Sequence, residues 1–104
     1  MRTMFERAGW NVCAEAVNGK EAVAMARELE PDIIVLDLSM PDMNGLTAGL
    51  ILKDIFPKTP LILFTSFASV VSTKDLQRAG FSALIDKSDA GKLVATAQSL
   101  VGAA

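Results

Sequence analysis

Three polar residues stand at the ends of apolar runs, and their types suit phosphoryl transfer. Asp37, Thr65 and Lys87 lie at or just past those ends, and the runs are 33–36, 61–64 and 83–85. Runs of this kind predict strands buried on both faces of a parallel sheet. Because parallel strands bring their carboxyl ends to one edge, we expect the three side chains to lie together there. A carboxylate would act as the nucleophile, while a hydroxyl and an ammonium hold the phosphoryl oxygens and offset their charge.

Each of these residues also has a simpler explanation. Asp37 could be a solvated loop carboxylate, because turn residues follow it. Thr65 could be a strand-end hydroxyl bonded to the backbone, and Lys87 could be a solvated charge. The interpretation therefore depends on the elements that position the three side chains.

The segments between the apolar runs predict helices. An apolar stripe at helical spacing marks 2–8, which Gly9 ends, and the pattern indicates a helix that begins before the chain does. A strand at 10–17 and a turn at Asn18-Gly19 follow. Further helices are expected at 20–29 and 46–56. A capping box that starts at Ser72 predicts a helix that runs to residue 79 and that Gly80 ends. A cap at Ser88 predicts the last helix, at the end of the chain. The inward faces expected for the two longer helices are Ala22, Val23, Ala26 and Leu29, and Leu46, Leu50, Ile51 and Ile55.

The predicted order is one helix followed by four strand–helix pairs. Such alternation is typical of an α/β fold with a parallel sheet and helices on both faces. Right-handed crossovers make the doubly wound, flavodoxin-like arrangement the natural choice. The length of 104 residues suits a single domain over 1–104.

Composition excludes several classes of function. Hydrophobic residues make up 51% and charged residues 21%, which predicts a buried core. The formal net charge of −2 gives no basic footprint for nucleic acid, and no apolar run suits a membrane span or a signal peptide. The sequence has no histidine, which excludes histidine-based catalysis. The one cysteine, Cys13, cannot form an internal disulfide, so we expect a cytoplasmic location.

Several short motifs in order resemble the receiver domain of two-component response regulators. The first is Asp37 followed by Met40-Pro41 and then Gly45. The others are the stretches 15–22 and 76–81 and the triplet Lys87-Ser88-Asp89. Each motif is weak alone, but together they cover nearly the whole chain at the family's spacing.

The resemblance implies a function and partners. In the family the aspartate, here Asp37, accepts a phosphoryl group from a histidine kinase or phosphotransfer protein, and Thr65 and Lys87 contact it. An output domain would complete the full-length protein. The family's strand order is 2-1-3-4-5, with helices on both faces.

Two departures from the family change the expectations for this chain. The family opens with a strand that ends in an acidic pair, whereas this chain begins inside the following helix, which predicts an N-terminally truncated sheet of four strands. For Mg²⁺ there remain the Asp37 carboxylate and, by resemblance, the Ser39 carbonyl, an incomplete site. The strand 33–38 would lose a neighbour, so we expect a homodimer that covers its edge. The second departure is Leu84, where the family often has a Tyr or Phe.

Two other functions remain to be weighed. A pseudo-receiver would use the same fold for protein interaction without phosphorylation. A hydrolase of the haloacid dehalogenase kind also has a strand-end aspartate, but it needs a second Asp where this chain has Ser39. We therefore expect no enzyme.

Overall fold

The fold is built on a parallel sheet. A computed structural model of the chain describes residues 2–10, 19–38, 43–66 and 68–102. Within these ranges the strands are β1 (Ile34–Leu38), β2 (Leu61–Thr65) and β3 (Ala83–Asp86), in the order β1-β2-β3. Both strand pairs are parallel. The strand expected at 10–17 lies largely outside the described residues.

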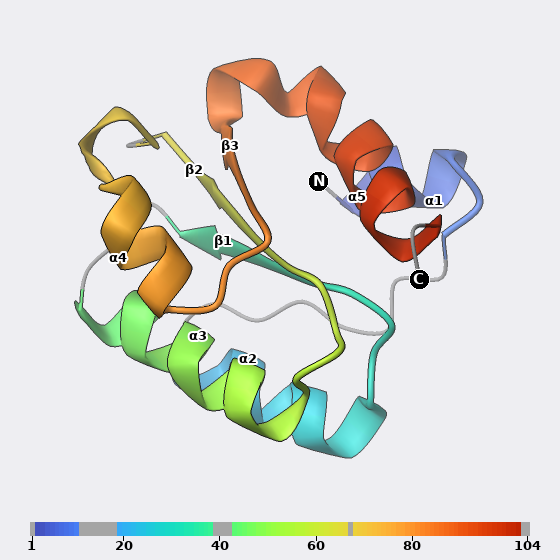
Figure 1. Cartoon of the computed structure of the whole chain (residues 1–104). Helices are drawn as coiled ribbons and strands as arrows, with labels where there is room; N and C mark the ends of the chain where they lie inside the picture. Colours follow the sequence, from blue (N-terminus) through green and yellow to red (C-terminus); the bar gives the residue numbers. More distant parts are fainter. Residues whose placement is uncertain (1, 11–18, 39–42, 67, 103–104) are drawn as a thin grey trace.

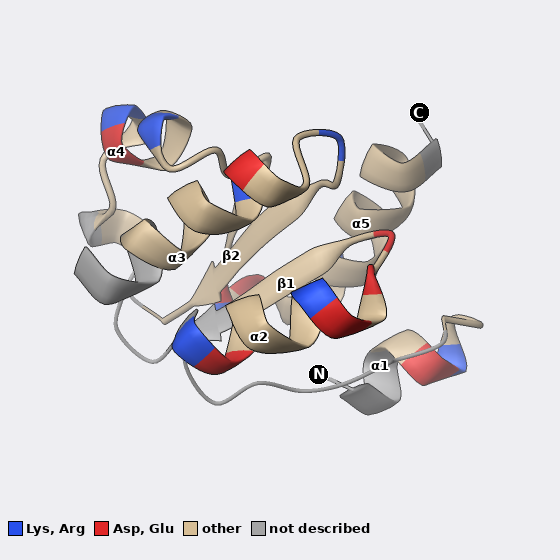
Figure 2. Cartoon of the chain, turned by 90° about the horizontal axis from the view of Figure 1, so that it is seen from below, with Lys and Arg blue, Asp and Glu red and all other residues tan. Residues whose placement is uncertain are grey.

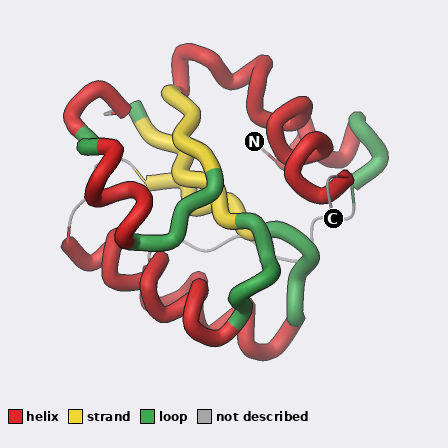
Figure 3. Tube along the Cα trace, in the orientation of Figure 1, coloured by secondary structure: helices red, strands yellow, loops and turns green. Residues whose placement is uncertain are grey.

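Helices cover both faces of the sheet. Figure 1 and Figure 3 show α2, α3 and α4 on one side, with α1, α5 and both chain termini on the other. The bounds are α1 Arg2–Arg7, α2 Gly19–Leu29, α3 Met43–Ile55, α4 Thr73–Arg78 and α5 Leu93–Gly102, with short 3-10 helices η1 Ala68–Val70 and η2 Lys87–Lys92. The predicted α/β class with a parallel, doubly covered sheet is therefore confirmed.

Strand β2 is the centre of the molecule. All five of its residues are buried, because β1 and β3 flank it and helices cover both of its faces. Its alternating side chains divide between two apolar clusters, with Leu61 and Leu63 in one and Ile62 and Phe64 in the other. This is the double-sided burial that the continuous apolar run predicts.

The two clusters draw on different helices. The first joins Leu61 and Leu63 to side chains of α2 and α3 and to the segment after α4; its other buried members are Ala22, Ala26, Ile34, Leu36, Leu52, Ala79 and Phe81. The second joins Ile62 and Phe64 to α1 and α5; its other buried members are Phe5, Ile85, Leu93 and Ala97. Charged side chains lie on α1, α2, α3 and α4 (Figure 2), whereas α5 carries none.

Two of the predicted inward faces need correction. Leu50 and Ile51 are 51% and 39% exposed, and Leu29 is 43% exposed. Among the residues of α3 whose burial is described, 47–55, the buried ones are Ala48, Gly49 and Leu52 instead. Apolar residues surround much of α3, so periodicity alone could not select its inward face.

The close approach at Gly49 shows why α3 turns this way. A Cβ at Gly49 would lie 2.7 Å from Cε2 of Phe81 and 3.0 Å from the carbonyl oxygen of Ala79. The missing side chain therefore lets α3 pack directly on the segment that leads into β3. Small residues on this side turn the larger leucine at position 50 and isoleucine at position 51 outward.

The boundaries of α4 follow their predicted signals. The Ser72 hydroxyl oxygen accepts a hydrogen bond of 3.0 Å from the Asp75 backbone N–H, as an N-cap does. At the other end Gly80 has φ of +79°, a left-handed conformation in which glycine commonly ends helices. Gly9 has φ of +90° and ends α1 in the same way.

Candidate functional site

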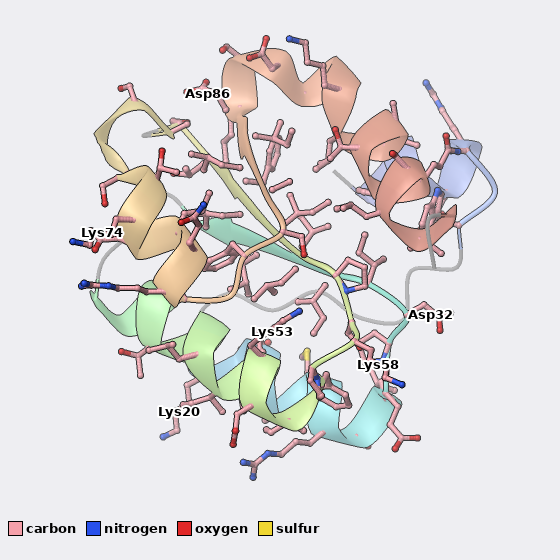
Figure 4. The ribbon with its side chains drawn as sticks, viewed as in Figure 1. Lys20, Asp32, Lys53, Lys58, Lys74 and Asp86 are labelled. Carbon is pink, nitrogen blue, oxygen red and sulfur yellow. The ribbon has the colours of Figure 1, made fainter. Side chains whose placement is uncertain are left out.

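The carboxyl ends of the three strands meet at one edge of the sheet. Asp37 is the next-to-last residue of β1, Thr65 is the last of β2, and Lys87 directly follows β3. Figure 4 shows Asp86 at this end, while Asp32 and Lys58, which precede β1 and β2, lie at the opposite end.

The strand register places the three predicted site residues within one residue of the level of Thr65. Asp37 is the partner of Phe64, and Thr65 is the partner of both Leu38 and Asp86. Thus Asp37 is one residue short of the level of Thr65, and Lys87 is one residue beyond it. Two strand spacings separate β1 from β3, about 10 Å. The backbone therefore brings all three positions within reach of one small group.

The two neighbours of Asp37 differ in exposure. Thr65 is completely buried at the end of the central strand. Lys87 opens η2 and is half-buried, and its Nζ lies 5.9 Å from the centroid of the Phe64 ring. That distance is within the range of a cation–π interaction. The edge thus combines a shielded hydroxyl with an ammonium that rests on an aromatic face.

A tight turn follows β3 and carries Lys87. The Asp86 Oδ1 atom accepts a hydrogen bond of 2.9 Å from the Ser88 backbone N–H and one of 2.8 Å from the Ser88 hydroxyl. Asp86 is therefore the N-cap of η2. The prediction that Ser88 caps the last helix is wrong. Helix η2 already begins at Lys87, so the residue before it, Asp86, accepts the hydrogen bond from the Ser88 backbone N–H.

These hydrogen bonds lower the pKa of Asp86 below its ordinary value. The Ser88 backbone N–H contributes most, followed by the Ser88 hydroxyl. Partial burial opposes the shift, and the Ala68 backbone N–H adds a smaller lowering. Since hydrogen bonds to a carboxylate favour its charged form, the turn is built around an ionised Asp86.

Removing this charge should flatten the acid dependence of stability. A carboxyl with a lowered folded pKa stabilises the fold above its unfolded pKa, and this contribution is lost as the pH falls through the folded pKa. We therefore expect the urea midpoint of the wild type to fall more steeply below about pH 4 than that of Asp86→Asn. The control is Asp32→Asn, which removes an exposed carboxylate at the opposite end of the sheet. Parallel curves for the wild type and Asp86→Asn would contradict the role of the turn.

The described residues do not by themselves supply a Mg²⁺ site. Within 2–10, 19–38, 43–66 and 68–102, no three acidic or cysteine side chains gather as metal ligands. The predicted ligand Ser39 lies outside these ranges, as do Met40 and Pro41. Asp86, at the same edge, has Oδ1 engaged by Ser88.

Sequence reasoning did not single out Asp86 and Phe64. Asp86 had a usable signal, because an aspartate two residues before a serine often closes a local turn on the backbone. Phe64 had none, since its place under Lys87 depends on how β2 and β3 pair.

In the described part of the chain, no helix is long and apolar enough to cross a membrane.

Comparison with known families agrees with this architecture. Residues 1–98 match the response regulator receiver domain. The chain belongs to this family. The resemblance inferred from the short motifs is thus confirmed over nearly the whole chain.

Individual relatives come from several kinds of protein. CheY of Thermotoga maritima is 33% identical over 87 residues, which cover 84% of this chain and 72% of CheY. The response regulator VraR of Staphylococcus aureus is 38% identical over 89 residues, covering 83% of this chain and 41% of VraR. A protein-glutamate methylesterase/protein-glutamine glutaminase of Photobacterium profundum is 40% identical over 82 residues, 79% of this chain but 18% of that protein. This receiver chain therefore matches a minor part of the two longer relatives.

Solved receiver structures superpose closely. A LuxR-family two-component response regulator from Aurantimonas covers 98% of this chain and 74% of its own, with a TM-score of 0.81 and 28% identity. CheY in the CheX–CheY–BeF₃–Mg²⁺ complex of Borrelia burgdorferi covers 95% and 76%, with a TM-score of 0.81 and 26% identity. The arrangement of the described strands and helices is thus that of a receiver domain.

Proposed function

We propose that this chain is the phosphoacceptor of a two-component phosphorelay and that Asp37 takes a phosphoryl group from a histidine kinase or a phosphotransfer protein. The observation that supports this most is the register, which brings Asp37, Thr65 and Lys87 to one sheet edge. Family membership also supports the proposal, because the relatives include response regulators.

In the proposed reaction each of the three residues has one task. A carboxylate oxygen of Asp37 attacks phosphorus and forms a P–O bond. The P–N bond to the donor imidazole breaks, and its electron pair stays on nitrogen. The Thr65 hydroxyl donates a hydrogen bond to a phosphoryl oxygen, and the Lys87 ammonium offsets the negative charge that gathers there.

Uptake from a small phosphodonor tests the proposal directly. The chain is incubated with acetyl phosphate and Mg²⁺, and intact mass is followed for the gain of one phosphoryl group. An acyl phosphate is cleaved by neutral hydroxylamine, whereas phosphate esters of serine and threonine survive, and peptide mapping should locate the label at Asp37. A chain that gains no mass would contradict the proposal and favour the pseudo-receiver.

Weak Mg²⁺ binding is a separate expectation. The donors expected from the sequence near Asp37 are its carboxylate and the Ser39 carbonyl, whereas Mg²⁺ demands an octahedral set of oxygens. In a Mg²⁺ titration followed by amide NMR shifts, we expect no saturation at concentrations that saturate CheY of Borrelia burgdorferi, which is known in a complex with BeF₃ and Mg²⁺ and is measured beside it. Equal affinities for the two proteins would contradict this prediction.

The wider setting follows from the proposed reaction. The chain would act as a signalling module in the cytoplasm, coupled to an output domain in the full-length protein. It would have no enzymatic activity on an outside substrate and would not itself contact nucleic acid, in keeping with its net charge of −2.

Self-association is also predicted. Among the described strands β1 lies at an edge of the sheet, and its residues Ile34 and Leu36 are apolar and buried. Such a strand is a template for pairing with a second copy. Light scattering should give the mass of a dimer, with amide protection of 34–38 that decreases on dilution. A monomer at all concentrations, with β1 paired to residues 10–16 of its own chain, would show the prediction to be wrong.

A further inference from the structure

The Lys87 ammonium contacts the Phe64 ring close to the proposed phosphoryl site. The Nζ atom of Lys87 lies 5.9 Å from the centroid of the Phe64 ring. A cation within about 6 Å of a ring centroid is attracted by the negative face of the ring. Phe64 also immediately precedes Thr65 in β2 and is the register partner of Asp37. The ring therefore belongs to the same few residues as the proposed phosphoryl site.

Phe64 is a rigid platform. It is 6% exposed and lies on the central strand, between β1 and β3. It packs in a buried cluster with side chains of α1, α5, β2 and β3: Phe5, Ile62, Ile85, Leu93 and Ala97. A ring packed among such close neighbours keeps its orientation. Its face thus offers a fixed resting place for a cation.

Lys87 by itself is not rigid. Its ammonium is a compact charge on a flexible four-carbon stem, and the side chain is half-buried at the start of η2. Such a stem has many rotamers, and fixing one of them at the moment of reaction carries an entropic cost. A preformed contact with the ring removes part of that cost. The gain is one of positioning, which accelerates a reaction when the group is already in place.

We propose that Phe64 is a positioning residue for the phosphoryl site, whose ring face holds the Lys87 ammonium at the strand ends beside Thr65 and Asp37. This inference rests on the proposed function, since it gives Lys87 the task of offsetting phosphoryl charge. It adds a residue that acts through Lys87 and does not touch the phosphoryl group. A simple packing role for Phe64 would affect stability alone.

The first test is the rate of phosphoryl uptake from acetyl phosphate. Phe64→Leu keeps an apolar side chain but removes the ring, and we expect uptake about two- to five-fold slower. The matched control is Phe81→Leu, the same change at a ring that is 7% exposed in the other cluster. Its rate should stay at the wild-type level. Phe64→Tyr keeps the ring and should restore most of the rate.

A second series separates the ring's charge distribution from its shape. Phe64 is replaced through a suppressed stop codon by phenylalanines that carry one, two and three ring fluorines, which weaken the negative face with little change in size. We expect uptake to slow stepwise with each fluorine. Equal rates along the series, or equal slowing in Phe64→Leu and Phe81→Leu, would overturn the inference.

A third measurement needs no phosphorylation. In the wild type, ring currents of Phe64 should displace the NMR signals of the Lys87 ε-methylene protons from those of the other lysines, and Lys87→Met assigns them by their loss. Phe64→Leu should return these signals to the common position, and Phe81→Leu should not. Undisplaced signals in the wild type would overturn the inference. A wild type that shows the displacement but takes up no phosphoryl group would refute the proposed function, and with it the task given to Lys87.

Discussion

Asp37→Asn is expected to reduce phosphoryl uptake to the background of the assay. The substitution replaces a carboxylate oxygen by an amide nitrogen of nearly the same size and removes the nucleophile that forms the P–O bond. Because Asp37 is next to the carboxyl end of β1 and the amide has nearly the same shape as the carboxylate, the fold should persist. Intact mass after incubation with acetyl phosphate measures the uptake, and circular dichroism checks the fold.

The control for this substitution is available in the same part of the chain. Asp32→Asn makes the same chemical change at an exposed residue that precedes β1, at the opposite end of the sheet. It should take up the phosphoryl group as the wild type does. Labelling of Asp37→Asn at the wild-type level would refute the assignment of the phosphoacceptor.

Lys87→Met should slow phosphoryl uptake without abolishing it. Lys87→Met removes a charge that offsets the developing negative charge of the phosphoryl group. Loss of one such electrostatic contact slows comparable reactions about 100-fold, and we expect a similar reduction here. A Lys87→Met variant that matches the wild type would mean that Lys87 is only a solvated charge, the simpler explanation of its position.

Leu63→Ala is expected to destabilise the fold by about 3 kcal/mol. Leu63 has no exposed surface, and it lies in the middle of the central strand between Leu36 and Leu84. Truncation leaves a cavity that two flanking strands and the helices above them can fill only in part. Since domains of this size are stable by about 5 to 15 kcal/mol, the variant should lose a large share of its stability.

Leu50→Ala is the matched control for this core substitution. It is the same change at a leucine that is 51% exposed on α3, and we expect an effect within about 0.5 kcal/mol. Urea unfolding followed by circular dichroism measures both variants. Equal destabilisation by the two substitutions would mean that Leu50 faces the core, as the sequence predicted, and that the observed orientation of α3 is wrong.

Much of the fold could be predicted because its signals are local. The apolar runs at 33–36 and 61–64 predicted buried strands, and the structure has β1 and β2 there. Ser72 and Gly80 marked the ends of α4 because capping depends on a few neighbouring backbone groups. Alternation of strands and helices then limited the topology to a parallel sheet.

The errors arose where several local solutions were equally good. Helix α3 is apolar around much of its circumference, so its inward face was decided by the contact between Gly49 and Phe81. For the cap before the last helix the sequence indicated Ser88, whereas β3 ends at Asp86 and η2 begins at Lys87, so Asp86 is the cap of η2. In both cases a partner distant in sequence, or the exact end of a strand, made the choice.

The sequence by itself determined which chemical groups stand at the strand ends: a carboxylate at Asp37, a hydroxyl at Thr65 and an ammonium at Lys87. Only the tertiary structure decided how these ends align, because register is a property of two strands and neither strand encodes it alone. The same pairing buried Thr65 and placed Lys87 over Phe64, a contact between positions that no local pattern links. Residue types thus follow from the chain, whereas their mutual geometry follows from the packing of the sheet.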